Sequence, residues 1–142
     1  MYSALDDIKK LCPEDTLIQL TDDDDVGVVS QTRVDEAIAS ADAVIDSYCG
    51  RKYSVPFAVV PDIVKAISID ITIYNLYSRR MEEIPATRTD RYKNAMAQLR
   101  DIAAGKVSIG EDPEPSASSQ SAHETEMSSE DRSFTRTKME DF

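Results

Sequence analysis

Four consecutive acidic residues, Asp22 to Asp25, come nearest to side chains that could do chemistry, because they resemble part of a metal loop. A calcium loop of the EF-hand type places oxygen ligands first, third and fifth, glycine sixth and a bidentate glutamate twelfth. Counted from the first aspartate, the third residue and Gly27 fit, but Val26 is fifth and Arg33 is twelfth. Because the ligand that closes the cage is missing, the sequence favours a solvated acidic turn, with calcium binding as the alternative.

Other residue types associated with catalysis form no recognisable constellation. The one histidine, His123, lies in a stretch rich in Ser, Glu and Pro, so a histidine triad or dyad in a folded body is not expected. The four glycines form no phosphate-binding motif. Cys12 and Cys49 lack CxxC spacing and are expected as reduced thiols, a disulfide being the alternative. We predict no catalytic residues, no cofactor and no metal, while a small enzyme or metal protein using the acidic turn stays open.

The stretch from Pro61 to Arg80 must position most of the remaining residues of interest. Its alternating isoleucines would suit a β-strand. At the helical period, however, its polar residues at 65, 68, 72, 75 and 79 fall on one narrow stripe and leave an apolar arc of roughly 240°. Pro61 suits the first helical position. We therefore predict a central buried helix, with core residues at Ile67, Ile71, Tyr74 and Tyr77.

Asp70 is the acid that points into this apolar arc. A carboxylate held there needs partners, and Arg51, Arg79 or Arg80 could supply one. We interpret Asp70 as an acid that stabilises the core or a subunit contact, a catalytic acid being the alternative.

Helical patterns also flank the central stretch. Two short helices are expected before residue 21, the first with a capping box that begins at Ser3. An amphipathic helix is predicted from Thr32 to Tyr48, with Tyr48 on its apolar face and Gly50 as its end, and another helix should close at Gly105. The sequence thus predicts an all-α protein, a small helical bundle around one central buried helix, spanning residues 1–110.

Residues 111–142 differ in composition and are predicted to form a long extended C-terminal tail, an acidic Ser/Pro-rich tether that ends in an apolar anchor. They carry a net charge of −6, against −5 for residues 1–110. No apolar run reaches the roughly 18 residues of a membrane span, so no membrane contact is expected. The residues predicted to dock on a partner are Phe134, Arg136, Lys138, Met139 and Phe142.

Bases gather between residues 79 and 106, on a body that is otherwise acidic. We predict that four of them meet acids of a neighbouring subunit, a solvated helix face being the alternative. These four are Arg79, Arg80, Arg88 and Arg91.

The order of these segments resembles the Mu-type phage head-tail adaptor, or head completion, family over about residues 1–110. The residues that carry the resemblance are Ile45, Asp46, Tyr48, Gly50, Arg51, Tyr53, Pro56, Pro61, Asp70, Leu76, Tyr77, Arg80 and the run from Leu99 through Gly105 to Gly110.

This resemblance implies a structural virion protein at the head-tail junction. It implies a ring, of about twelve copies, beneath the portal protein, which extends the DNA channel and offers a platform for a stopper or tail-terminator protein. The acidic composition agrees with a lumen through which DNA passes without specific binding. The alternative from another class is a small cytosolic protein-interaction module with a regulatory acidic tail.

Overall fold

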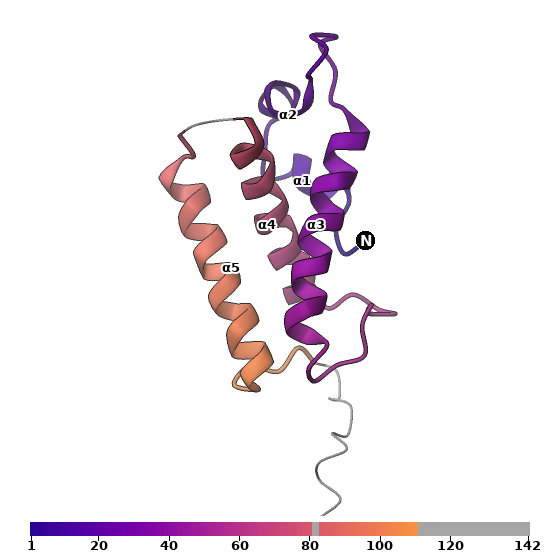
Figure 1. Ribbon diagram of the computed structural model, residues 1–142, viewed down its shortest axis with the longest axis vertical. Coiled ribbons are helices and arrows are strands. Elements are labelled where there is room, and N and C mark those ends of the chain that lie inside the picture. The colour runs from indigo at the N-terminus through magenta and orange to yellow at the C-terminus, as the bar shows by residue number, and fades with distance from the viewer. Residues whose placement is uncertain (81–82, 111–142) are drawn as a thin grey trace, which may run out of the picture.

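Five α-helices build the described part of the chain in the computed structural model, which describes residues 1–80 and 83–110 (Figure 1). They are α1 (Leu5–Lys9), α2 (Glu14–Thr21), α3 (Gln31–Cys49), α4 (Asp62–Arg80) and α5 (Ala86–Ala104). The three long helices α3, α4 and α5 run alternately down, up and down, and the two short ones lie beside the upper half of this bundle (Figure 1). The predicted all-α class is confirmed for the described residues, and the predicted tail, residues 111–142, lies outside them.

The central position predicted for α4 is confirmed, because α4 contacts each of the other four helices. Its isoleucines point to different neighbours. Ile67 and Ile71 belong to a cluster with Ile45, on α3, and Leu99, on α5. Ile73 belongs to a second cluster near α1 and α2. Because α4 is covered on nearly all sides, isoleucines can stand at positions 67, 69, 71 and 73, and this alternation resembles the pattern of a β-strand. The segment is nevertheless helical, because burial of these side chains outweighs the poor helix propensity of β-branched residues.

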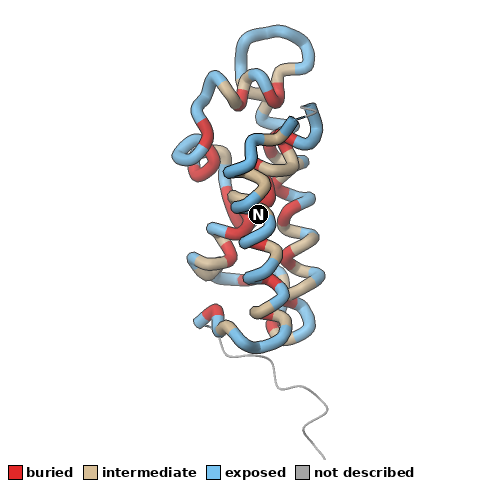
Figure 2. Tube along the Cα trace, turned by 90° about the vertical axis from the view of Figure 1, so that its left-hand side faces the viewer, coloured by how far each residue is buried: buried red, intermediate tan, exposed pale blue. Residues whose placement is uncertain are grey.

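The stripe of polar residues on α4 is buried in its middle. Ser68 and Thr72 are both 0% exposed, and Figure 2 shows how much of the bundle interior is buried. The Ser68 hydroxyl lies 2.9 Å from the Ser3 hydroxyl and donates to Asp42 Oδ1 at 3.1 Å. At Ser68 the stripe therefore faces polar groups of α3 and the N-terminal segment, and not solvent.

The N-terminal segment is fixed to α3 by polar contacts. The Tyr2 N–H donates to Asp42 Oδ2 at 3.0 Å, and the Tyr2 hydroxyl donates to Asp46. Burial, and then this bond to Asp46, raise the pKa of the Tyr2 hydroxyl. Because Ser3 takes part in the buried contact with α4, it does not cap α1: the cap is Ala4.

The remaining boundaries follow the predicted pattern with small shifts. Helix α4 begins after Pro61, whose carbonyl accepts from the Lys65 N–H at 3.0 Å, so Pro61 precedes the helix and is not its first residue. Helix α5 begins directly after Pro85 and ends, as predicted, at Gly105, which adopts φ 75°. At this left-handed φ glycine avoids the strain that a side chain would bring.

The predicted core residues differ in exposure. Ile67, Ile71 and Tyr77 are buried, whereas Tyr48, Tyr74 and Pro61 are half-buried. Tyr74 stacks on Tyr92 of α5, with ring centroids 4.0 Å apart and an angle of 13° between the rings.

Cys12 and Cys49 are free, buried thiols. Burial, and then the charge of Asp46, raise the pKa of the Cys49 thiol to about 11. Within the described residues, no helix has both the length and the apolarity that a bilayer crossing requires.

Replacing Thr72 by valine is expected to raise the free energy of unfolding by about 1 kcal/mol. The Thr72 Oγ1 atom is buried and has no hydrogen-bond partner among the described residues, so a methyl group of similar shape removes a desolvation cost. Urea unfolding followed by circular dichroism measures the change. Thr21→Val is the matched control and should be destabilising, because the Thr21 hydroxyl donates to the Leu17 carbonyl at 2.7 Å and accepts from the Ser30 N–H at 3.0 Å. A Thr72→Val variant less stable than wild type would contradict this account.

Candidate functional site

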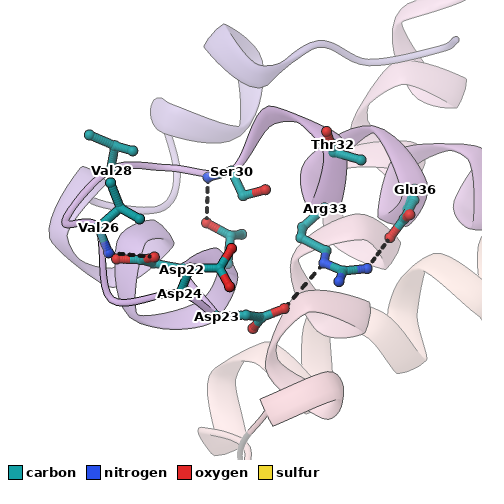
Figure 3. Close-up of a pocket in the computed structure, with 10 residues that line it drawn as sticks. Asp22, Asp23, Asp24, Val26, Val28, Ser30, Thr32, Arg33 and Glu36 are labelled. Carbon is teal, nitrogen blue, oxygen red and sulfur yellow. Dashed lines mark hydrogen bonds and ion pairs between the residues drawn. The ribbon is translucent and has the colours of Figure 1, made fainter.

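The acidic turn connects α2 and α3 at one extreme of the bundle, the upper one in Figure 1. An open pocket of about 480 Å³ lies against it (Figure 3). Its lining residues are Thr21, Asp22, Asp23, Asp24, Val26, Val28, Ser30, Thr32, Arg33 and Glu36.

Asp22 folds the turn on itself. Its carboxylate accepts hydrogen bonds from the Val26 N–H at 3.0 Å and the Gly27 N–H at 2.6 Å. These backbone donors hold the pKa of the Asp22 carboxyl below its ordinary value. Asp25 and Gly27 adopt positive φ values of 58° and 79°, which aspartate and glycine tolerate better than most residues. Both Asp22 oxygens are therefore used to shape the backbone.

Asp23 holds three arginines, and we call Asp23 with Arg33, Arg79 and Arg80 the arginine clamp. Arg79 donates to Asp23, Arg33 Nε lies 3.2 Å from Asp23 Oδ2, and Arg80 Nη1 lies 3.3 Å from Asp23 Oδ1. The bond from Arg79 is the largest of the effects that lower the pKa of the Asp23 carboxyl. Because Arg79 also donates to the Leu20 carbonyl at 2.9 Å, the last turn of α4 is attached to both α2 and the acidic turn.

The turn is therefore more than the solvated loop that the sequence favoured: its base is held by the clamp, and only its tip is free of such bonds in the part of the chain that the structure describes. The tip carries Asp24 and Asp25 and two valines, Val26 and Val28, which are 68% and 59% exposed. The exposed tip therefore combines acidic and apolar side chains.

Titration with calcium up to about 1 mM is expected to leave the melting temperature and the NMR shifts of residues 22–27 unchanged. Within residues 1–80 and 83–110, no three His, Cys, Asp or Glu side chains converge as metal ligands. In addition, both oxygens of the Asp22 carboxylate already accept hydrogen bonds from backbone N–H groups. Calcium takes about six to eight oxygen ligands, so a site of useful affinity would require this turn to refold. A saturable shift below 1 mM would contradict the prediction.

Asp70 pairs with Arg91, whose Nε lies 2.8 Å from Asp70 Oδ1. The prediction of Arg51, Arg79 or Arg80 as its partner is wrong. Arg79 lies nine residues further along α4, about 14 Å at the helical rise, whereas α5 packs beside α4 and brings Arg91 alongside. The Asp70 side chain is 17% exposed and the Arg91 side chain 47%, so the pair lies at the edge of the interface between the two helices.

The four arginines predicted for a subunit interface all bond within their own protomer. Arg79 and Arg80 belong to the clamp, Arg91 pairs with Asp70, and Arg88 donates to the Leu11 carbonyl at 2.6 Å. Their role toward a neighbouring copy stays a prediction. The predicted partner-docking residues of the tail, 134–142, lie outside the described residues.

Two acids of α3, Asp42 and Asp46, order the N-terminal segment, and they were not predicted to do so from the sequence. A weak signal was present, because Ser68 belongs to a polar stripe on a helix otherwise wrapped in apolar residues and so required a polar neighbour. Nothing in the spacing indicated which acid would supply it.

Replacing Asp23 by asparagine is expected to lower the melting temperature at pH 7 and to do so more strongly at low ionic strength. Without the carboxylate, three guanidinium groups face one another, and salt screens their repulsion. Since the folded-state pKa of Asp23 is lowered, its stabilising contribution is present above the ordinary value of 3.8 and is lost as the pH falls below it. The difference between wild type and variant should therefore shrink toward pH 3. Asp25→Asn, in the same turn, is the control and should change little; equal effects would refute the clamp.

The chain matches the family described as "Bacteriophage Mu, Gp36" over residues 2–128. It is also similar to the protein named "Mu-like prophage FluMu protein gp36" of Haemophilus influenzae, with 30% identity over 82 residues. This match covers 58% of the present chain and 56% of the relative, so the aligned stretch spans about half of the relative's length.

Proposed function

Because this chain belongs to the Bacteriophage Mu Gp36 family, we propose that it is a structural virion protein of the head-tail junction. In this proposal the helical body assembles as an adaptor ring of about twelve copies beneath the portal protein. The ring extends the channel for DNA and presents a platform to which a stopper or tail-terminator protein attaches.

The observation that carries the proposal is that the described body neutralises most of its own bases. Asp23 pairs with three arginines, and Asp70 pairs with Arg91 of α5. The two carboxylate oxygens of Asp7 lie 3.0 Å from the Nζ atoms of Lys10 and Lys65, one oxygen to each lysine. The excess negative charge therefore remains exposed while few bases are free to hold phosphates. A channel built from such bodies repels DNA and lets it slide, because phosphate contacts by free Lys and Arg dominate DNA affinity.

Complementation of a phage that lacks its member of this family tests the proposal. Infected cells without the protein should accumulate DNA-filled heads and separate tails. Purified full-length protein, added to an extract of these heads and tails, should restore infectious particles. Antibody labelling of the restored particles should place the protein at the head-tail joint. Particles that form normally without it, or labelling elsewhere, would refute the proposal.

Binding to DNA should be weak as well. At about 150 mM salt, double-stranded DNA of random sequence should not be retained by the protein. The dissociation constant should be no lower than that of nonspecific DNA-binding proteins, about 1 to 100 μM. Tight, salt-resistant DNA binding would contradict a passive channel. A monomer that binds a soluble partner and is absent from virions would favour the interaction-module alternative.

A further inference from the structure

A basic groove lies where α3 and α5 end, at the opposite extreme of the bundle from the acidic turn (Figure 1). It is open, with a volume of about 380 Å³. We call it the basic groove, and its lining residues are Ser47, Tyr48, Arg51, Arg100 and Ala103.

The two arginines of the basic groove are exposed and, within the described residues, form neither an ion pair nor a hydrogen bond. Lys52, Arg88 and Lys93 also lack an acidic partner in this part of the chain, but Arg51 and Arg100 are the two bases that line the groove together. They are not needed to cap the helices beside them. At the end of α3, the Lys52 and Tyr53 N–H groups donate to the Cys49 carbonyl. At the end of α5, the Gly105 N–H donates to the Ile102 carbonyl and the Lys106 N–H to the Asp101 carbonyl. Two free guanidinium groups beside a half-buried tyrosine are suited to bind carboxylates.

The acidic turn offers the matching chemistry. Counting the arginine clamp and Glu36, acids at that end still exceed bases by two. Asp24 and Asp25 at the tip have no ion-pair partner in the described part of the chain, and the exposed Val26 can cover the Tyr48 ring. Helix α3 separates the turn from the basic groove by its 19 residues, about 28 Å, so one chain cannot join its own two sites.

We propose that the acidic turn of one copy docks in the basic groove of the next. Asp24 and Asp25 accept hydrogen bonds from Arg51 and Arg100, and Val26 packs on Tyr48. Because the two surfaces differ and lie at opposite ends, the contact is head-to-tail and propagates from copy to copy until it closes as a ring. This inference rests on the proposed function and names the subunit contact of the ring.

Mixing two neutralised variants of the full chain tests the contact. Asp24→Asn with Asp25→Asn removes the acidic surface, and Arg51→Gln with Arg100→Gln removes the basic one. Sedimentation at low salt should show wild type in species larger than dimers, dissociating as salt is added. Each variant alone should associate at least tenfold more weakly. The mixture of the two should stop at heterodimers, because each variant keeps one working surface.

Reversing the charges of both surfaces should restore association that reversing one surface abolishes. Arg51→Glu with Arg100→Glu should abolish association, and adding Asp24→Arg and Asp25→Arg to the same chain should restore it. Circular dichroism checks that each variant is folded, and Lys93→Gln, an exposed base of α5 that does not line the groove, is the control that should change nothing. Failure of the reversed chain to associate while folded would overturn the proposal.

Three further outcomes would overturn it too. One is a wild type that remains monomeric at about 1 mM and low salt, and another is a wild type that stops at a dimer. The third is a loss of association on neutralising Glu111, Asp112 and Glu114 and not on neutralising the turn, which would assign the groove to the segment after Gly110. The complementation assay separates the two proposals. An Arg51→Gln, Arg100→Gln chain that restores infectious particles refutes the contact alone, whereas an associating wild type that restores none refutes the adaptor function alone.

Discussion

Replacing Ile71 by alanine is expected to lower the free energy of unfolding by about 3 kcal/mol, one of the two largest effects that we predict. The Ile71 side chain is 1% exposed and lies in the cluster where α4 meets α3 and α5. Truncation removes buried methyl groups and leaves a cavity that three packed helices cannot easily fill. The better helix propensity of alanine offsets only about 0.4 kcal/mol of this loss.

Chemical unfolding in urea, followed by helical circular dichroism, measures the effect as a lower midpoint with an unchanged slope. Ile69→Ala is the matched control: it makes the same change in the same helix at a half-buried position and should cost less than half as much. Equal losses at both positions would mean that α4 is not the covered central helix that we describe.

Replacing Asp42 by alanine is expected to cost about 2 kcal/mol. This carboxylate accepts from the Tyr2 N–H at 3.0 Å and from the buried Ser68 hydroxyl at 3.1 Å, so its loss leaves a buried hydroxyl with one partner fewer. Hydrogen bonds to a charged group are worth about 1.5–3 kcal/mol each, and the gain in helix propensity recovers part of that.

The N-terminal segment should also be released from the bundle. Hydrogen exchange at the Tyr2 amide is expected to accelerate in Asp42→Ala before the bundle as a whole unfolds. Asp90→Ala, an exposed acid of α5, makes the same chemical change at a surface site and should alter stability by no more than about 0.5 kcal/mol. Unaltered exchange at Tyr2 would contradict the role assigned to Asp42.

The helices could be predicted because their signals are local. The apolar spacing from Thr32 to Tyr48 and the glycine at position 105 correspond to α3 and to the end of α5 within a residue or so. The capping box of α1 could not be placed in the same way. Ser3 has the right chemistry for a cap, but a buried contact 65 residues away in sequence competes for its hydroxyl.

The candidate site was only half predictable. The four aspartates of the turn indicated charge, and the departures at Val26 and Arg33 argued against calcium. That Asp23 would hold three arginines depends on which end of α4 meets the turn, because Arg33 is ten residues away and Arg79 is 56. Neither hydrophobic periodicity nor composition indicates that residues so far apart in the sequence lie close together in space.

The sequence by itself determined which segments are helical and that the stretch from Pro61 to Arg80 is wrapped by its neighbours. These are consequences of the spacing of apolar side chains along one chain. Only the tertiary structure decided that Asp70 meets Arg91, that Asp23 gathers the arginine clamp, and that the acidic turn and the basic groove lie at opposite ends of the bundle. The physical reason is that an ion pair requires two groups within a few ångströms, and that proximity is set by how helices pack against one another, a relation that no single helix encodes.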